Sequence, residues 1–476
     1  MTTDASRLAS DSRTVAFWTL VSRITGFGRV AAMAAVLGPT FFGNLFQTTL
    51  YLPYLICELM AGSLITAMLA PHLVRALDAG DEAAARRLAR GFFGIVLPIF
   101  AAVALLCMAA APLLLSLLTL AVDDPAVRAR QQTLGWMLLL CLLPQIVLYG
   151  VSGIGIAVQH AHRRFAFATA APIIENVAMM SVLGITALVF GVGLDVEHVS
   201  RGQVLLLGLG STAAVALHAA AQWWGAWRLG IALLPRAGWL DGQVRGILRI
   251  AALSSGSSGL NSVGLLTLMV AAGQVPGGAV AFQIASNFFN LPIALCARPI
   301  ASAQLPLLSG HHGRGAAGDF HATYRYSLRL ALLIALPASL VFVGVPELLA
   351  RCVAMGDMRT PEAIALIAAA ISGLGLGIVA ESAFVVSTSA AYARHDAASP
   401  LQAMMIRLAV LLCGVALAPS AGRDDLTLWH LGLAGAAASI AAALYLYWRL
   451  VRRPGIGRAL PRAEPPATGA EPGAPA

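Results

Sequence analysis

The chain contains no lysine and few charged residues of any kind. Charged side chains make up 11% of its 476 residues, whereas hydrophobic ones make up 59%. A soluble globular domain carries about 25% charged residues, so this composition excludes an ordinary soluble protein. It indicates a polytopic membrane protein. All 31 basic residues are arginines, which we attribute to a GC-rich genome rather than to a functional demand.

Signatures of enzymes and of metal sites are also missing. The six cysteines are scattered and show no C-x-x-C spacing, which argues against a disulfide framework or a metal site. A Walker A motif is absent, so the chain itself is not expected to hydrolyse ATP. The pairs His160/His162 and His311/His312 fall in basic loops without ligand spacing. We therefore predict a protein that is not an enzyme and that holds no metal and no cofactor.

Apolar stretches long enough to cross a bilayer, which takes about 20 residues, recur along the whole chain. The N-terminal segment lacks the pattern of a cleavable signal peptide, so the first stretch is expected to stay in the protein. We predict an all-α polytopic membrane protein with about 12 transmembrane helices. The predicted spans are 14–37, 42–70, 92–120, 134–158, 170–194, 204–227, 247–273, 280–308, 327–349, 361–388, 398–418 and 429–450.

The placement of arginine predicts the orientation of the chain. With the N-terminus in the cytoplasm, 21 arginines fall on the cytoplasmic side, 6 on the other side and 4 within spans. Short cytoplasmic loops of membrane proteins carry the excess of arginine. Both termini are therefore predicted to be cytoplasmic. The net charge of +9 then reflects topology, and no nucleic-acid partner is expected.

A faint internal repeat predicts two lobes. The pattern L-P-x-x-x-C-x-x-x-x-x-S occurs at 52–63 and again at 291–302, an offset of 239 residues and of six spans. Parallel repeats of this kind are typical of transporters whose site lies between the repeats, although chance similarity between Leu- and Pro-containing helices is the alternative. We predict an N-terminal six-helix lobe at 1–230, a C-terminal six-helix lobe at 240–451 around a shared central cavity, and a disordered cytoplasmic tail at 452–476.

Two arginines interrupt the first span. An arginine in the middle of a bilayer costs about 3 kcal/mol on insertion scales, so it usually faces a cavity or a partner. Arg23 lies about 13 Å into the span, which is deep for a side chain that snorkels to the interface. It is separated from Arg29 by roughly 120° of helical rotation, so the two share one face only if the helix bends at Gly26 or Gly28. We predict that Arg23 and Arg29 bind an anion in a water-filled cavity.

Two further arginines fall within spans. Arg298 stands next to Pro299 in the eighth span, where it either points into the cavity or pairs with a carboxylate. Arg407 lies nearer to the cytoplasmic end of its span and is predicted to be an interfacial anchor.

Three carboxylates, Glu58, Glu175 and Glu381, also lie well within spans. Each either pairs with an arginine or carries a coupling proton or cation. Glu175 follows Pro172 and is expected at a polar break between helices.

Taken together, these residues resemble the MurJ/MviN lipid II flippases, which belong to a superfamily that also contains MATE exporters and polysaccharide flippases. The similarity runs over nearly the whole chain, and its most specific part is S-R-I-T-G-F-G-R in the first span. The matching stretches are 22–29, 52–71, 164–176, 291–306, 392–400 and 431–434. The resemblance implies a bacterial cytoplasmic (inner) membrane protein of peptidoglycan biosynthesis that flips an undecaprenyl-pyrophosphate-linked precursor.

The resemblance also implies roles for residues. Arg23 and Arg29 match two first-span arginines that bind the pyrophosphate in this family, and Arg298 is a candidate for a third. The acidic residue that usually follows the second arginine is Val30 here, and the span-two arginine position falls on Cys57 or Glu58.

Two other departures from the family concern the second half of the chain. The span-eight arginine position falls near Asn287, eleven residues before Arg298. Family members commonly have fourteen spans, whereas this sequence predicts twelve.

Three functions remain open at this point. The first is a flippase whose substrate is a lipid-linked glycan, lipid II or a relative of it, moved by rocking of the two lobes. The second is a cation-coupled small-molecule exporter similar to MATE proteins, with Glu58, Glu175 or Glu381 as the coupling site. The third is a transport-inactive scaffold for cell-wall synthesis enzymes, which the missing arginines suggest.

Overall fold

The computed structural model describes residues 2–60, 64–232, 234–235, 256–417 and 423–452, and every regular element in these ranges is a helix. The first half contains α1 (Thr2–Leu37), α2 (Phe41–Met60), α3 (Leu64–Asp78), α4 (Glu82–Ala109), α5 (Ala111–Leu118), α6 (Pro125–Leu142), α7 (Gln145–Ala161), α8 (Phe165–Ala170), α9 (Pro172–Phe190) and α10 (Arg201–Arg228). The tail predicted to be disordered lies outside the described residues from position 453 onwards.

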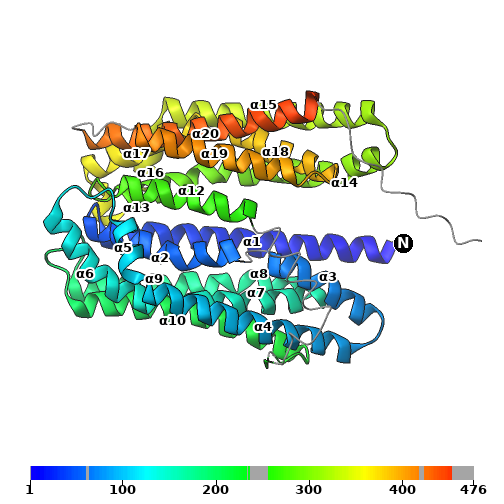
Figure 1. Cartoon of the computed structure of the whole chain (residues 1–476), viewed down its shortest axis with the longest axis horizontal. Coiled ribbons are helices and arrows are strands. Elements are labelled where there is room, and N and C mark those ends of the chain that lie inside the picture. Colours follow the sequence, from blue (N-terminus) through cyan, green and yellow to red (C-terminus); the bar gives the residue numbers. More distant parts are fainter. Residues whose placement is uncertain (1, 61–63, 233, 236–255, 418–422, 453–476) are drawn as a thin grey trace, which may run out of the picture.

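The second half contains α12 (Gly256–Ala272), α13 (Gly278–Pro292), the π-helical turn η2 (Ile293–Ala297), α14 (Arg298–Gly313), α15 (Ala317–Gly344), α16 (Pro346–Val353), η3 (Gly356–Arg359), α17 (Pro361–Gly375), α18 (Ile378–Ala393), α19 (Ala398–Ala416) and α20 (Asp424–Arg452). Figure 1 shows that the long helices of both halves run along one common axis.

About twelve helical passes make up the bundle, as the sequence predicts. Among the described residues, nine helical segments are long and apolar enough to cross a membrane, and α17 with α18 forms a tenth that bends by 47°. The pair α2–α3 and the shorter α12 occupy the predicted second and seventh spans. The predicted third span at 92–120 differs, because the helix ends at Ala109 and α5 begins anew just before Pro112.

The two ends of the bundle differ in composition. At one end α1 begins, α3 leads into α4 and α14 leads into α15 (Figure 1). We call it the basic end, because its connections carry Arg75, Arg86, Arg87 and Arg314. The opposite end holds α5, the start of α6, and α16.

Side-chain caps explain where several helices begin. Asp81 accepts a hydrogen bond from the Ala84 amide (2.7 Å) at the start of α4, and Asp124 accepts one from the Ala126 amide (2.7 Å) at the start of α6. Thr360 caps α17 in the same way. Such caps satisfy amides that have no partner within the helix, so short polar residues at the ends of apolar runs fix the boundaries of the spans.

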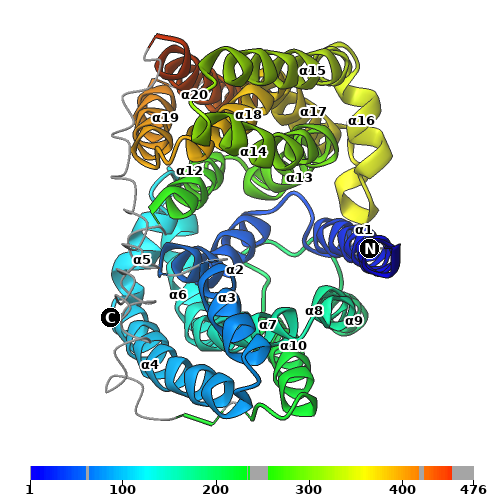
Figure 2. The same cartoon turned by 90° about the vertical axis from the view of Figure 1, so that its right-hand side faces the viewer.

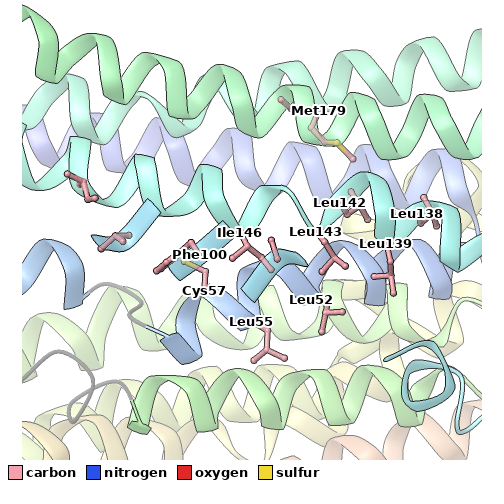
Figure 3. Packing of buried hydrophobic residues seen from close by; sticks show 14 of the residues in the cluster. Leu52, Leu55, Cys57, Phe100, Leu138, Leu139, Leu142, Leu143, Ile146 and Met179 are labelled. Atoms are coloured by element: carbon pink, nitrogen blue, oxygen red, sulfur yellow. The ribbon is translucent and has the colours of Figure 1, made fainter. Parts of the chain in front are cut away.

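Hydrophobic packing divides into two large clusters, one in each half of the chain. The first joins α2, α4, α6, α7 and α9, and Figure 3 shows Leu52, Phe100, Leu139 and Ile146 packed together there. The second joins α13, α17, α20 and neighbouring helices around Phe282 and Ile367. The end-on view in Figure 2 shows these halves as two groups of helices on either side of α1, α2 and α12.

Inter-lobe contacts gather at the opposite end of the bundle. Asn44 of α2 donates to the backbone oxygens of Gly273 (3.3 Å) and Val275 (2.7 Å), and its Oδ1 accepts from the amide of Ala279 (2.9 Å). One buried amide side chain thereby satisfies three backbone groups of the other half. This arrangement holds the two halves together at that end.

The crossing of α17 and α20 depends on two glycines. A Cβ at Gly432 would lie 2.9 Å from the Gly373 Cα, and a Cβ at Gly373 would lie 2.5 Å from the Trp429 oxygen. Since packed cores resist overpacking, we expect Gly432→Ala to destabilise the protein by about 1–3 kcal/mol. Gly184 of α9 has nothing within 4 Å of its Cβ position, so Gly184→Ala is the matched control.

The measurement is thermal unfolding of both variants in the same detergent. Gly432→Ala should melt several degrees below the wild type, whereas Gly184→Ala should melt at or above it because alanine favours the helix. Equal melting of the two variants would show that the α17–α20 crossing relaxes at little cost.

Candidate functional site

Two central cavities adjoin each other between the halves. The N-lobe cavity, of about 540 Å³, is lined mainly by α1, α2, α7, α9 and α10. The C-lobe cavity, of about 500 Å³, is lined mainly by α12, α13, α14, α18, α19 and α20. Tyr54 and Glu58 of α2 line both of them. This turn of α2 therefore separates two adjoining cavities that lie between the two halves.

One face of α1 packs against α9 and aims Arg29 into the N-lobe cavity. Ser22, Thr25, Gly26 and Arg29 follow the i, i+3, i+4, i+7 spacing of a single helix face. On α9, Asn176 donates to the Thr25 hydroxyl (3.1 Å) and to the Ser22 oxygen (3.4 Å). The polar residues of the first-span motif thus join two helices, and Arg29 follows one turn further on.

Arg29 belongs to a buried polar network. Its Nη1 lies 3.1 Å from Glu175 Oε1, and His218 Nδ1 lies 2.9 Å from Glu175 Oε2. Glu175 and His218 are nearly covered, with side-chain exposures of 13% and 9%, whereas Arg29 keeps 33%. A guanidinium has five N–H donors. Since one of them binds Glu175, the others remain available to an anion in the cavity.

The network continues behind the histidine. Gln222 Nε2 lies 3.3 Å from His218 Nε2 and 3.0 Å from the Ala168 oxygen, and Gln159 donates to Gln222 Oε1 (2.6 Å). A neutral His218 that donates from Nδ1 to the carboxylate accepts at Nε2 from Gln222. The chain of hydrogen bonds fixes the Glu175 carboxylate, and with it the guanidinium of Arg29.

Arg23 lies elsewhere. It is exposed on α1, which continues as one helix through Gly26 and Gly28, and it does not line either central cavity. The rotation of about 120° between the two arginines is therefore not removed by a bend. The structure places Arg29 alone of this pair in the cavity.

Arg298 lines the C-lobe cavity. It is the first residue of α14, directly after the π-helical turn η2 that follows Pro292. Such turns often occur at functional sites. Its side chain is exposed, and it forms no salt bridge within the part of the chain that the structure describes.

The prediction that Arg407 is an interfacial anchor is wrong. Its guanidinium forms a salt bridge with Glu381 (2.8 Å to Oε2), and Ser439 donates to the same oxygen (2.9 Å). The side chains of Arg407 and Glu381 are only 18% and 13% exposed, and both line the C-lobe cavity. The position of Arg407 along its span suggested that it lies at the membrane–water interface. Its salt bridge with Glu381 on α18 instead compensates the cost of burying its charge.

Of the three carboxylates within spans, Glu58 alone has no arginine partner among the residues that the structure describes. Tyr54 donates to its Oε1 (3.1 Å), and its Oε2 is buried without a hydrogen-bond partner. Three more buried acceptors of the two cavities lack partners, namely Gln47 Oε1, Gln283 Oε1 and Thr388 Oγ1. An unpaired buried acceptor costs about 1–3 kcal/mol. These atoms are covered by surrounding side chains, so a ligand in the cavities would reach them only after the lining side chains rearrange.

Sequence reasoning missed His218 and Gln222. Both lie in the predicted sixth span, four residues apart on one helix face. A titratable residue in an apolar span was the signal that could have found them. In the described residues there is no group of three or more His, Cys, Asp or Glu side chains that could hold a metal ion.

Comparison with known proteins now decides the family. The family model described as lipid II flippase MurJ matches residues 33–460. The chain belongs to the lipid II flippase MurJ family. A probable lipid II flippase MurJ of Rhizobium meliloti (strain 1021) is 25% identical over 451 residues, which cover 94% of this chain and 81% of the relative. The lipid II flippase MurJ of Burkholderia cenocepacia is 23% identical and covers 93% and 84%.

Solved structures show the same fold. The chain matches a lipid II flippase MurJ in an inward closed conformation with a TM-score of 0.74 and 14% identity, covering 92% of this chain and 87% of that one. It also matches an inward-facing multidrug resistance MATE family transporter of the MOP superfamily with a TM-score of 0.68 and 12% identity, covering 90% and 94%. The fold of the MurJ family and that of MATE transporters are thus shared by this chain.

Proposed function

We propose that this chain moves a polyprenyl-pyrophosphate-linked cell-wall precursor, lipid II in the first instance, to the outer leaflet of the bacterial cytoplasmic membrane. Membership of the MurJ family supports the reaction class. The observation that carries the proposal is Arg29, which faces the N-lobe cavity with unused donors while Glu175 and His218 hold it in place. Guanidinium groups bind phosphate oxygens through paired charge-assisted hydrogen bonds.

We assign the pyrophosphate and the sugar headgroup of the substrate to different residues of the two cavities. Arg29 in one cavity and Arg298 in the other would bind the pyrophosphate, and the polar lining residues Gln47, Gln283 and Thr388 would face the sugar headgroup. Glu381 and Arg407 neutralise each other, so they shape the C-lobe cavity without adding net charge. The two cavities together are lined by three arginines and three glutamates, so their formal net charge is zero. Anion binding would therefore depend on the local positions of Arg29 and Arg298, not on an excess of positive charge.

Alternating access follows from the placement of the inter-lobe contacts. The basic end carries the excess of arginine, so we assign it, with both termini, to the cytoplasm. The lobes, proposed to span 1–230 and 240–451, are joined at the opposite end by Asn44. Rocking about the central cavities would then open that end to the outside. Outward movement of each negative charge gains about 2.3 kcal/mol per 100 mV, so the membrane potential supplies a driving force.

Complementation tests the proposed substrate. Expression of the wild-type chain should restore growth to a bacterial strain depleted of its own lipid II flippase. Protein levels are compared by immunoblot, so that poor expression is not mistaken for inactivity. Failure of a well-expressed wild type would reject lipid II as substrate and leave another lipid-linked glycan or one of the other functions.

Cation-coupled export is the second candidate, and Glu58 favours it. This carboxylate lines both cavities and has a buried oxygen without a partner, a position suited to a proton or cation. For a potential-driven flippase we expect Glu58→Gln, which keeps the shape of the side chain, to retain at least about half of the rescue. Complete loss of rescue by Glu58→Gln at matched protein levels would show that transport requires the Glu58 carboxylate, as cation coupling demands, whereas failure of the wild type to rescue is the outcome that leaves small-molecule export.

A further inference from the structure

An apolar groove runs along the outer side of the C-terminal half, away from both central cavities. It has a volume of about 530 Å³. Helices α15 and α20 both pack on α18, so α18 forms its floor and the other two form its walls. In Figure 2 these two helices lie at the outer rim with α18 between and beneath them. The floor consists of small and branched side chains, including Val379, Ala380 and Ala383.

Two arginines stand on one wall of this groove. Arg325 and Arg329 are one turn apart on α15 and are both exposed. Arg325 Nε donates to the His321 oxygen (3.3 Å), and neither guanidinium forms a salt bridge within the described ranges. On the other wall α20 contributes Tyr447, and α18 contributes no charged side chain to the lining. The charge in the groove is therefore entirely positive.

The arginines lie where the lipid-facing wall begins. Arg329 is about 18 Å along α15 from its first residue, and exposed apolar side chains follow directly on the same helix, among them Leu330, Leu333, Ile334 and Leu336. An arginine at this boundary extends its guanidinium into the headgroup region. The phosphates of membrane lipids lie at this boundary, and basic side chains near it bind anionic lipids.

We propose that this groove is a binding site for one anionic phospholipid, whose phosphate lies between Arg325 and Arg329 and whose acyl chain lies along α18. The groove fits both parts of such a ligand. The arginine pair matches the negative charge of the phosphate, and the apolar floor matches the acyl chain. The site is separate from the transport cavities. It therefore does not depend on the identity of the transported molecule.

The test measures thermal stabilisation of the purified full chain in detergent. Phosphatidylglycerol should raise the melting temperature in a saturable manner, and phosphatidylcholine with the same acyl chains should raise it much less. Arg325→Gln/Arg329→Gln should weaken the apparent phosphatidylglycerol affinity about tenfold or more, as loss of charge-assisted contacts to phosphate requires. The control Arg86→Gln/Arg87→Gln removes the same charge from exposed arginines that already pair with Glu82 and Asp81, and it should leave the affinity unchanged.

A second variant tests the apolar half of the site. Ala380→Leu fills the floor of the groove while leaving both arginines in place, and it should also weaken binding of phosphatidylglycerol. Melting of each variant without lipid shows whether it is folded. Equal stabilisation by both phospholipids, or an equal effect of both double arginine variants, would overturn the proposal. Stabilisation by inorganic phosphate as strong as that by the lipid would reduce the site to an anion site without a lipid groove.

Discussion

Arg29→Ala is expected to lose rescue of a flippase-depleted strain, with transport about 10- to 100-fold below the wild type. The loss corresponds to one charge-assisted contact to a phosphate, worth about 1.5–3 kcal/mol. Arg29 is the arginine that lines the N-lobe cavity, and a third of its side chain remains accessible there. Rescue is measured as plating efficiency at matched protein levels. Arg86→Ala, which removes an exposed arginine of α4, is the control and should rescue fully.

A structural role for Arg29 must be separated from a binding role. Its removal leaves Glu175 buried beside His218 alone, and breaking a fully buried pair costs about 3–5 kcal/mol. Because Arg29 is 33% exposed, we expect a smaller loss of stability. The double variant Arg29→Ala/Glu175→Ala removes both charges and should regain stability without regaining transport. Recovery of rescue in the double variant would show that Arg29 serves only to neutralise Glu175, and would reject Arg29 as the ligand of the pyrophosphate.

The second large effect concerns the opposite end of the bundle. Gly38, at the end of α1, and Gly193, after α9, both have positive φ values, +64° and +67°. The carboxylate of Asp357 in η3 reaches between them, 2.1 Å from a Cβ built on Gly38 and 2.2 Å from one built on Gly193. The C-terminal half thus inserts an acidic side chain into a notch that only glycine leaves open.

Gly38→Ala is therefore expected to open this end. An alanine at positive φ costs about 1–2 kcal/mol, and the clash with Asp357 adds about 1–3 kcal/mol. The backbone strain is present in both states, so only relief of the clash raises the population of the state in which the halves are separated there, by roughly 5- to 150-fold. The measurement is labelling of a cysteine at Gln47, which lines the N-lobe cavity, by a maleimide that cannot cross the membrane. This cysteine is introduced into a variant in which all six native cysteines are replaced.

Two controls isolate the cause. Gly80 has a φ of +73° and nothing within 4 Å of its Cβ position, so Gly80→Ala adds the backbone strain without any clash. It should leave labelling unchanged. Asp357→Gly combined with Gly38→Ala removes the clash and should return labelling part of the way to the wild-type level. Unchanged labelling in Gly38→Ala would show that Asp357 moves aside and does not keep the halves together.

The passes of the chain were predictable because they depend on local composition. A bilayer demands about 20 apolar residues per helix, and the spans predicted from 361, 398 and 429 correspond to α17–α18, α19 and α20 within a few residues. The break before α5 was less visible, because Pro112 lies inside an apolar run that reads as one span. The sequence predicted a cavity role for Arg29, but not the shared face of Ser22, Thr25 and Arg29 or its partner Asn176 on α9, about 150 residues away.

The sequence by itself determined that this is a helical membrane protein of about twelve spans with charges inside them, since burying an arginine in a membrane requires a cavity or a partner wherever it occurs. Only the tertiary structure decided which charges meet. It paired Arg29 with Glu175 and Arg407 with Glu381. Within the described residues it gave Glu58 no arginine partner, and it placed Arg23 outside the two central cavities. The reason is geometric. A contact between two spans depends on how each helix is rotated and on how all helices of the bundle pack, and a local stretch of sequence specifies neither.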